Sequence, residues 1–191
     1  TVPNIATDAD GRYRGTDLKV HQGDVESPRY TVYSLWDTFR ATHPLLIVLQ
    51  PERTQQFVRN FLDMHDEGGS LPMWELAANY TDCMIGYHAV PVIADAWAKG
   101  LRGFDAERAL EAMVAEATAD ELSKPVWDSL GFLPLEKESE SVSKTLEYAF
   151  DDACIAKMAA DMGNVEVAEW FGRRAQGWKN LFNPDNGFLQ P

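Results

Sequence analysis

A tryptophan, an aspartate and an arginine lie close together in the segment YSLWDTFRATHPL. Trp36, Asp37 and Arg40 stand at positions i, i+1 and i+4, so a short helix would direct an apolar ring and two charged groups toward one region. An indole ring packs on the apolar C–H face of a sugar, while a carboxylate and a guanidinium pair with its hydroxyls. We therefore predict a carbohydrate contact. A surface Asp37–Arg40 pair beside a core tryptophan is the simpler alternative.

A second tryptophan stands beside an acid in LPMWELAANY, a segment too short and irregular to assign to a helix. Trp74 and Glu75 lie in the kind of irregular backbone that often carries ligand contacts. His88 follows in a largely apolar stretch, which favours a hydrogen-bonded core histidine over a ligand. Trp74 and Glu75 are thus candidates for ligand contact, and His88 is a candidate for support.

The predicted helix over residues 141–162 carries its charges on one stripe. At about 100° per residue, Lys144, Glu147 and Asp151 share one narrow face with Tyr148 and Ile155. The opposite side is apolar and consists of Leu146, Ala149, Phe150, Ala153, Ala156 and Ala160. A solvated surface is the simpler interpretation of the charged stripe. The neighbouring aromatic residues favour instead one wall of a site that binds something polar.

The elements that must position these residues follow from apolar spacing, from caps and from turn residues. We predict a short helix over 34–43 that Pro44 ends, a helix from Pro51 to the DEGGS turn, and helices over 85–100, 104–119, 141–162 and 165–182. Residues 120–140 are expected to form a loop through Pro125 and Pro134. Pro91 would have to lie in a first turn or make a kink.

About six helices without a convincing strand predict an all-α fold. Residues 1–33 are expected to form an extended, polar lead-in, and residues 34–191 a single domain of helical hairpins. Such hairpins build either an α/α toroid or a helical-repeat solenoid. The chain shows no tetratricopeptide-like repeat of 34 residues, which favours the toroid.

The composition limits the classes of partner. The net charge of −13 over 191 residues disfavours nucleic acid or an anionic membrane, and favours a neutral or cationic ligand or a metal ion. No run approaches the roughly 18 apolar residues of a membrane-spanning helix. Cys83 and Cys154 match no zinc pattern, and two buried free thiols are favoured over a disulfide. Spacings of the GxSxG, P-loop, GxGxxG, HExxH and EF-hand types do not occur.

Five segments together resemble one enzyme family. They read PNIATDADGRYRG, YTVYSLWDTFRATHPL, LPMWELAANYTDCMIGYHAVPVIADAWAKG, SVSKTLEYAFDDACIAKMA and NLFNPDNGFLQP. In order and spacing they are similar to the central part of the glycoside hydrolase family 92 exo-α-mannosidases. The resemblance covers nearly the whole chain, and its Trp-Asp-Thr-Phe-Arg and Gly-Tyr-His-Ala-Val-Pro-Val-Ile blocks are long enough to be specific.

The resemblance implies an amino-terminal β-sandwich joined to an (α/α)6 toroid, and calcium-dependent, inverting hydrolysis of terminal α-linked mannose, such as N-glycan mannose. It implies that Asp37 and Trp74 lie in the pocket of the terminal mannose. The residues expected to line or brace that pocket are Trp36, Arg40, Glu75, His88, Lys144, Glu147 and Asp151. Arg is also familiar at the position of Lys144, which makes a bidentate contact there less certain. Leu146, Phe150 and Ala153 would pack toward neighbouring helices.

The resemblance also implies what lies elsewhere. The general acid, the base carboxylates and the calcium ligands are expected beyond Pro191, so no catalytic residue and no metal ligand is assigned to this chain. About half of the toroid would be present, without the sandwich, which predicts a fragment that is inactive alone. Secretion, or a periplasmic or cell-surface location, follows only from the resemblance. Another (α/α)6 carbohydrate-active enzyme, or a non-catalytic helical interaction module with an acidic face, is the alternative.

Overall fold

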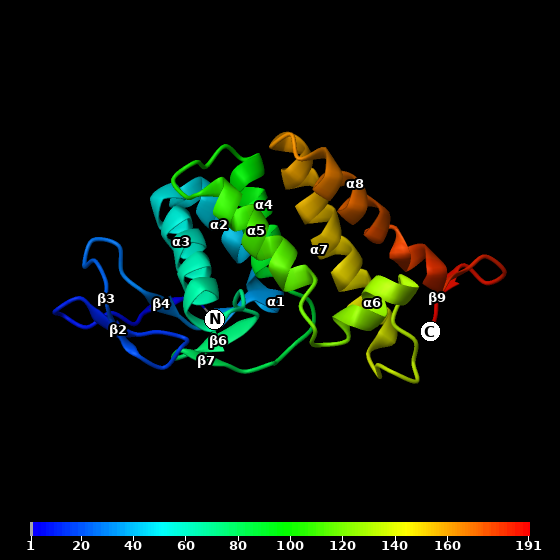
Figure 1. Ribbon diagram of the computed structural model, residues 1–191, viewed down its shortest axis with the longest axis horizontal. Coiled ribbons are helices and arrows are strands. Elements are labelled where there is room, and N and C mark those ends of the chain that lie inside the picture. The colour runs from blue at the N-terminus through cyan, green and yellow to red at the C-terminus, as the bar shows by residue number, and fades with distance from the viewer. Residues whose placement is uncertain (1) are drawn as a thin grey trace.

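The computed structural model describes residues 2–191 and is about half helical (Figure 1). The helices of these residues are α1 (Leu35–Thr38), α2 (Thr42–Leu49), α3 (Pro51–Gly68), α4 (Ala89–Ala98), α5 (Ala106–Ala117), α6 (Lys124–Leu130), α7 (Ser141–Asp161) and α8 (Val165–Arg174), with a 3-10 turn η1 (Gly177–Leu181). Helices α2 to α5 form one group, and the α7–α8 hairpin lies beside it (Figure 1). Helix α4 packs on α7 and on α2, α3 and α5, so it joins the two groups.

Short strands make the predicted all-α class imprecise. They are β1 (Asn4–Ile5), β2 (Arg12–Arg14), β3 (Val20–Gln22), β4 (Tyr30–Thr31), β5 (Tyr33–Ser34), β6 (Trp74–Leu76), β7 (Asn79–Tyr80), β8 (Phe182–Asn183) and β9 (Phe188–Leu189). All pairings between them are antiparallel, and β5, β6 and β7 form a sheet of three strands. Strands of two or three residues are too short to show the alternation by which a strand is recognised in a sequence.

Two helix predictions were wrong because of proline. Pro44 does not end a helix over 34–43; that helix stops at Thr38, and Pro44 lies in the first turn of α2. Residues 124–130 form α6 where a loop was predicted, with Pro125 near its start. A proline in a first turn removes an N–H that would have no helical partner anyway. The same rule applies to Pro91, which was predicted to lie in a first turn or to make a kink. It lies in the first turn of α4.

The core lies between the helix groups. Phe57 and Phe61 of α3, Ile93 of α4, Met113 of α5 and Ile155 of α7 are at most 1% exposed. This periodicity was predicted for α3 and α5, although the acidic side chains of Glu67 of α3 and Glu116 of α5 are buried and pair with Arg29 and Lys124. The helices therefore form where apolar residues recur every three or four positions and can be buried against a neighbour.

Helix α7 buries the charged face that the simpler interpretation left exposed to solvent. Its charged stripe is turned inward, and Asp151, Tyr148 and Ile155 are at most 1% exposed. On its apolar side Phe150 is 46% exposed and Ala153 is also exposed. The solvated-face interpretation is therefore wrong. Phe150 still packs on Phe39, at the end of α1, with 5.6 Å between the ring centroids, while Ala153 is left exposed.

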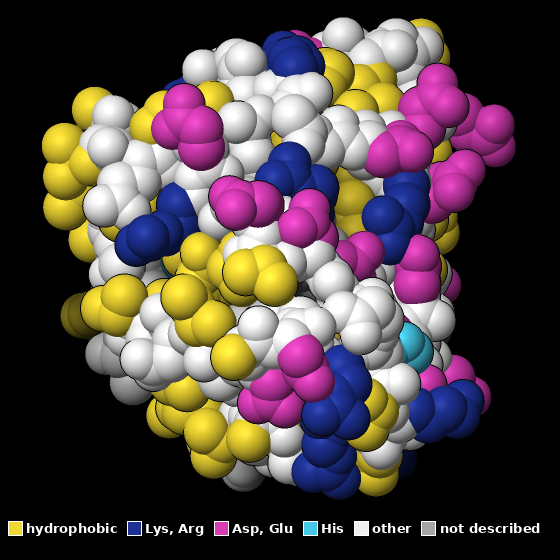
Figure 2. Space-filling model, turned by 90° about the vertical axis from the view of Figure 1, so that its left-hand side faces the viewer, with side chains coloured by type: hydrophobic (Ala, Val, Ile, Leu, Met, Phe, Trp, Pro, Cys, Tyr) yellow, Lys and Arg dark blue, Asp and Glu magenta, His cyan; other side chains and the backbone are white. Residues whose placement is uncertain are grey.

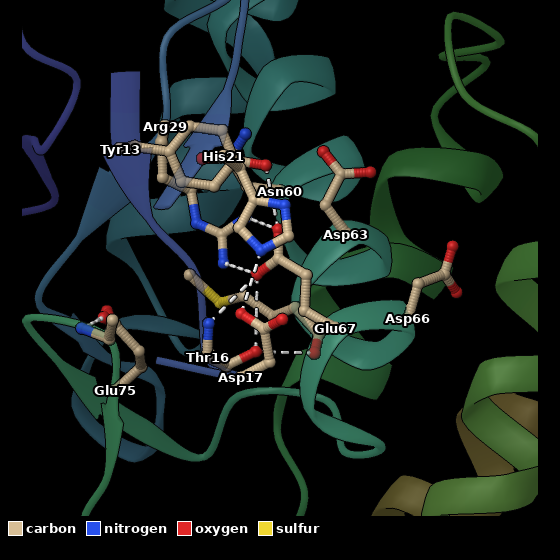
Figure 3. A network of polar contacts seen from close by, with 12 residues as sticks. Tyr13, Thr16, Asp17, His21, Arg29, Asn60, Asp63, Asp66, Glu67 and Glu75 are labelled. Atoms are coloured by element: carbon tan, nitrogen blue, oxygen red, sulfur yellow. Dashed lines mark hydrogen bonds and ion pairs between the residues drawn. The ribbon is translucent and has the colours of Figure 1, made fainter. Parts of the chain in front are cut away.

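The extended segment before β4 is fastened to α3 through one carboxylate, that of Glu67 (Figure 3). Arg29 donates to both Glu67 oxygens at 2.7 and 3.2 Å, and the Tyr13 hydroxyl donates at 2.8 Å. The Thr16 N–H donates to it at 3.0 Å. These four bonds connect the β2–β3 hairpin and the strand before β4 to one helix, so they fix the path of the chain toward β5.

The surface distributes its charge in pairs. Figure 2 shows Lys and Arg side chains interspersed among Asp and Glu on the face it draws. Arg108, for example, bonds Asp63 and Asp66 at 3.1 and 2.5 Å. Both cysteines are free, as expected, but Cys83 is exposed and Cys154 only partly buried. Among residues 2–191, no helix has the length and apolar character needed to cross a membrane.

Candidate carbohydrate-binding site

Strand pairing brings the two tryptophan segments together. Ser34 ends β5 immediately before α1, and it lies opposite Trp74 of β6 in the antiparallel ladder. Residues directly opposite in such a ladder point to the same face of the sheet, with Cβ atoms about 5 Å apart. The Ser34 hydroxyl also donates to the Asp37 carboxylate. Ser34 thus pairs with Trp74 across the ladder and bonds Asp37, although Trp74 and Asp37 are 37 positions apart in the sequence.

Helix α7 reaches the same region through Glu147. The indole N–H of Trp36 donates to Glu147 Oε1 at 3.2 Å, and Arg40 Nη2 donates to the same oxygen at 2.7 Å. The guanidinium of Arg40 lies over the Trp36 ring at 5.1 Å and over the Phe39 ring at 4.6 Å. Because Arg40 is held by one anion and two ring faces, its orientation is restricted although its side chain is 49% exposed.

His88 connects the group of Trp36, Arg40 and Glu147 to the buried carboxylate of Asp151. His88 is fully buried; its Nε2 lies 3.3 Å from Glu147 Oε2, and its Nδ1 lies 2.9 Å from Asp151 Oδ1. The Phe39 ring stacks on the imidazole at 4.2 Å. The Tyr87 N–H donates to the other Asp151 oxygen at 2.8 Å. Burial raises the pKa of Asp151, and His88 opposes that rise. Asp151, His88 and Glu147 therefore form a chain of polar contacts, the carboxylate–imidazole relay, that ends at Trp36 and Arg40.

Asp152 is a second buried acid and was not among the predicted site residues. It accepts from the Tyr87 hydroxyl at 2.6 Å, from Trp127 Nε1 at 2.9 Å and from Arg174 Nε at 2.9 Å. Burial raises its pKa to about 6 despite these donors. Asp152 joins α6, α7 and α8 and holds Tyr87 next to the relay. Its signal in the sequence was an acid on the face that also carries Tyr148 and Ile155.

Two predicted site residues, Glu75 and Lys144, form hydrogen bonds elsewhere and do not join the group of Trp36, Asp37, Arg40 and Glu147. The carboxylate of Glu75 is 2% exposed and accepts from Thr31, Val32 and Ala78. Lys144 bonds Glu138 at 2.6 Å in the loop before α7, away from Arg40. Ser34 and Phe39 were missed, because their importance comes from the Asp37 and His88 side chains that they contact. The Ser34 side chain caps no N–H of α1, and its hydroxyl bonds the Asp37 side chain instead.

The remaining features of this region indicate a surface that is open to a ligand. A cavity of about 340 Å³ lies beside the group and includes Phe39, Arg40, Pro91 and Phe150, but not Trp36, Asp37 or Trp74. No three His, Cys, Asp or Glu side chains of residues 2–191 are grouped so that they could hold a metal ion. The arrangement can therefore offer two indole rings, a carboxylate and a guanidinium to a polar ligand at the surface.

Comparison with known proteins was made by family and by structure. The model of the glycosyl hydrolase family 92 catalytic domain matches residues 1–191. A curated relative from Arthroderma benhamiae, described as an uncharacterized secreted glycosidase, is 28% identical over 159 residues, which are 68% of this chain and 20% of that protein.

The solved structures include the family GH92 alpha-mannosidase BT3965 from Bacteroides thetaiotaomicron, with TM-score 0.94, 41% identity, and coverage of 98% of this chain and 26% of that one. The same mannosidase in complex with mannoimidazole also has a TM-score of 0.94 and 41% identity, with coverage of 98% and 25%. The inverting mannosidase BT2199 from the same species has a TM-score of 0.87 and 35% identity, with coverage of 98% and 26%.

The extent of these matches is uneven. The chain spans about a quarter of the length of the solved structures and a fifth of the curated relative. The family model, in contrast, matches every residue of the chain, and the similarity in fold extends over nearly all of it. The resemblance seen in the five sequence segments is therefore confirmed: the chain belongs to glycosyl hydrolase family 92.

Proposed function

We propose that this chain forms part of the terminal-mannose pocket of a calcium-dependent, inverting exo-α-mannosidase. The observation that carries the proposal is that Trp36 and Arg40 share the carboxylate of Glu147, while Asp37 bonds Ser34, the residue that pairs with Trp74 of β6. Family membership and the mannosidases among the similar structures support it. In this proposal the helical hairpins around α4 are part of an (α/α)6 toroid.

The residues of this chain would bind and orient the sugar. The C–H face of a mannose ring packs on an indole, and its hydroxyls donate to Asp37 and accept from Arg40. The carboxylate–imidazole relay holds Glu147, which in turn holds Trp36 and Arg40, so the first contacts of the sugar rest on a buried support. Such contacts can contribute binding energy toward distortion of the ring.

We assign the catalytic carboxylates and the calcium ligands to residues outside this chain. An inverting glycosidase needs an acid and a base carboxylate roughly 6.5–9.5 Å apart, and we assign neither to this chain. The side chains of residues 2–191 also do not assemble a metal site, so calcium would have to be held by residues outside them. We propose export as well, supported only by the relative described as secreted.

The test is mannose release from α-1,2-mannobiose by the full-length protein, with and without a calcium chelator. We expect Asp37→Asn to lower kcat/KM about 100-fold, because a site built to bond sugar hydroxyls loses an ionised acceptor. Trp74→Ala should lower it about tenfold by removing a stacking face. Asp120→Asn and Trp170→Ala are matched controls on other surfaces and should leave it unchanged.

The alternatives give different results. Release of another sugar would indicate a different carbohydrate-active enzyme. No hydrolysis by the wild-type protein, together with no sugar binding that depends on Asp37, would indicate an interaction module. Release that continues in the presence of the chelator would contradict the calcium dependence.

A further inference from the structure

The segments around Trp74 contain backbone conformations that L-residues seldom adopt. The φ angles of Val32, Ala77 and Ala78 are 68°, 51° and 66°. Ala77 and Ala78 form the two-residue turn between β6 and β7, where Asn-Gly or Gly-Gly is usual. A β-branched residue with positive φ, such as Val32, is less common still. Such a residue is strained and persists only where its surroundings enforce the conformation.

One carboxylate contacts all three of these positions directly or through one hydroxyl. Glu75 Oε2 accepts from the Val32 N–H at 3.1 Å, and Oε1 accepts from the Ala78 N–H at 2.6 Å. The Thr31 hydroxyl lies 3.0 Å from both oxygens and accepts from the Ala77 N–H at 2.7 Å. The Glu75 carboxylate thus satisfies donors that point inward only because the backbone is strained.

These bonds occupy Glu75. It is 2% exposed, and each oxygen already faces one N–H and the shared hydroxyl. Figure 3 shows it set apart from the cluster around Glu67, so it is not an extension of that network. Glu75 is among the residues that line a cavity of about 280 Å³, but a sugar that bonded its carboxylate there would compete with the donors that hold the hairpin. Its contacts therefore argue against the substrate contact that its place beside Trp74 suggested.

The clamped hairpin determines where Trp74 lies. Trp74 precedes Glu75 in β6 and pairs with Ser34, whose hydroxyl bonds Asp37. The Trp74 carbonyl also accepts from the Thr81 hydroxyl at 2.6 Å, beyond the turn. We infer that Glu75 is a positioning residue that holds the strained hairpin and thereby places the Trp74 ring beside Asp37 to receive the sugar. This inference rests on the proposed function.

The test measures, in the full-length protein, the activity that Glu75→Gln loses and the activity that two added glycines recover. Glu75→Gln keeps the shape but replaces one carboxylate oxygen by an NH2 group, so only one of the Val32 and Ala78 N–H groups keeps an acceptor. We expect kcat/KM for α-1,2-mannobiose to fall at least tenfold, mainly through KM, because Trp74 is displaced. Adding Ala77→Gly and Ala78→Gly should recover at least threefold, since glycine adopts positive φ without the clamp. Glu52→Gln, an exposed residue of α3, is the control and should leave kcat/KM unchanged.

A second measurement does not depend on activity. Hydrogen exchange of peptides that contain Val32 and Ala78 should be faster in Glu75→Gln than in the wild type, and unchanged exchange would overturn the clamp. If the wild type is active and the glycines recover nothing, Glu75 contacts substrate directly and the inference is wrong. If the wild type releases no mannose, the proposed function fails, and the exchange result still decides whether the clamp exists.

Discussion

Glu67 and Glu147 each hold an arginine at 2.7 Å, but their surroundings differ. The side chains of Glu67 and Arg29 are 8% and 4% exposed, and Tyr13 and Thr16 complete the set of donors. Glu147 is 15% exposed, its arginine is 49% exposed, and its second oxygen faces His88 Nε2, which makes no hydrogen bond within the described residues.

The difference separates two uses of a carboxylate. Around Glu67 the polar groups satisfy one another inside the protein, so the cluster fastens the extended segment to α3. Around Glu147 the buried contacts end at a tryptophan and an arginine that remain available at the surface. A closed cluster of this kind indicates a structural role, and an open one indicates a place for a ligand. Substitutions in the two clusters test this contrast.

Removing Arg29 should have the largest effect on stability. Arg29→Met leaves the buried Glu67 carboxylate without its charge partner, and loss of one member of a buried pair costs about 3–5 kcal/mol. Urea unfolding of the full-length protein measures the loss, and hydrogen exchange localises it to β2, β3 and α3. Adding Glu67→Gln should recover much of the loss, because the amide oxygen still accepts from Tyr13. A loss below about 1 kcal/mol in the single variant would contradict the structural role.

Two buried histidines, His43 and His88, also differ in their polar contacts. Neither ring nitrogen of His43 has a hydrogen-bond partner among residues 2–191, whereas His88 contacts two carboxylates. His43 packs edge to face with Phe57 and Phe61, and burial lowers its pKa to about 4. The unfolded chain, with a histidine pKa of about 6.5, therefore takes up the proton first as the pH falls.

The pH dependence of stability follows from this. The His43 contribution is lost as the pH falls from about 6.5 to 4, by up to about 3 kcal/mol. Asp152 acts in the opposite direction, because its raised pKa of about 6 stabilises the fold as the pH falls through that value. The measurement is therefore the difference in unfolding free energy between wild type and His43→Leu at pH 7 and pH 4.5. It should shift in favour of the leucine variant at pH 4.5, and a constant difference would contradict the prediction.

The smallest effect on stability is expected at Glu147. Glu147→Gln should change the free energy of unfolding by about 1 kcal/mol or less, because its arginine is half exposed. It should nevertheless lower kcat/KM for α-1,2-mannobiose about tenfold, because Trp36 and Arg40 lose their shared anion. Glu138→Gln is a matched control: Glu138 is also 15% exposed and bonds Lys144 at 2.6 Å. Equal activity losses in both variants would remove the distinction between the open cluster and an ordinary ion pair.

Local patterns predicted the parts of the fold that depend on neighbouring residues. Helices α3, α4, α5 and α7 were recognisable because their apolar residues recur with helical spacing over two or more turns. The grouping of Trp36, Asp37 and Arg40 needed only one turn of backbone. The short strands were not recognisable because two or three residues show no alternation, and α6 was missed because of its proline. The Glu67 cluster was not recognisable because its donors lie 38 to 54 positions away.

The family, the main helices and the residue types that suit a sugar could be recognised from local spacing or from contiguous motifs. Folding, in contrast, decided which face of α7 is buried, because periodicity shows that two faces differ but not which one meets the rest of the chain. It also decided the partners of the carboxylates. Glu147 meets Trp36 from 111 residues away, and Glu75 meets Thr31 from 44. A carboxylate acquires its role from the donors around it, and folding brings those donors together.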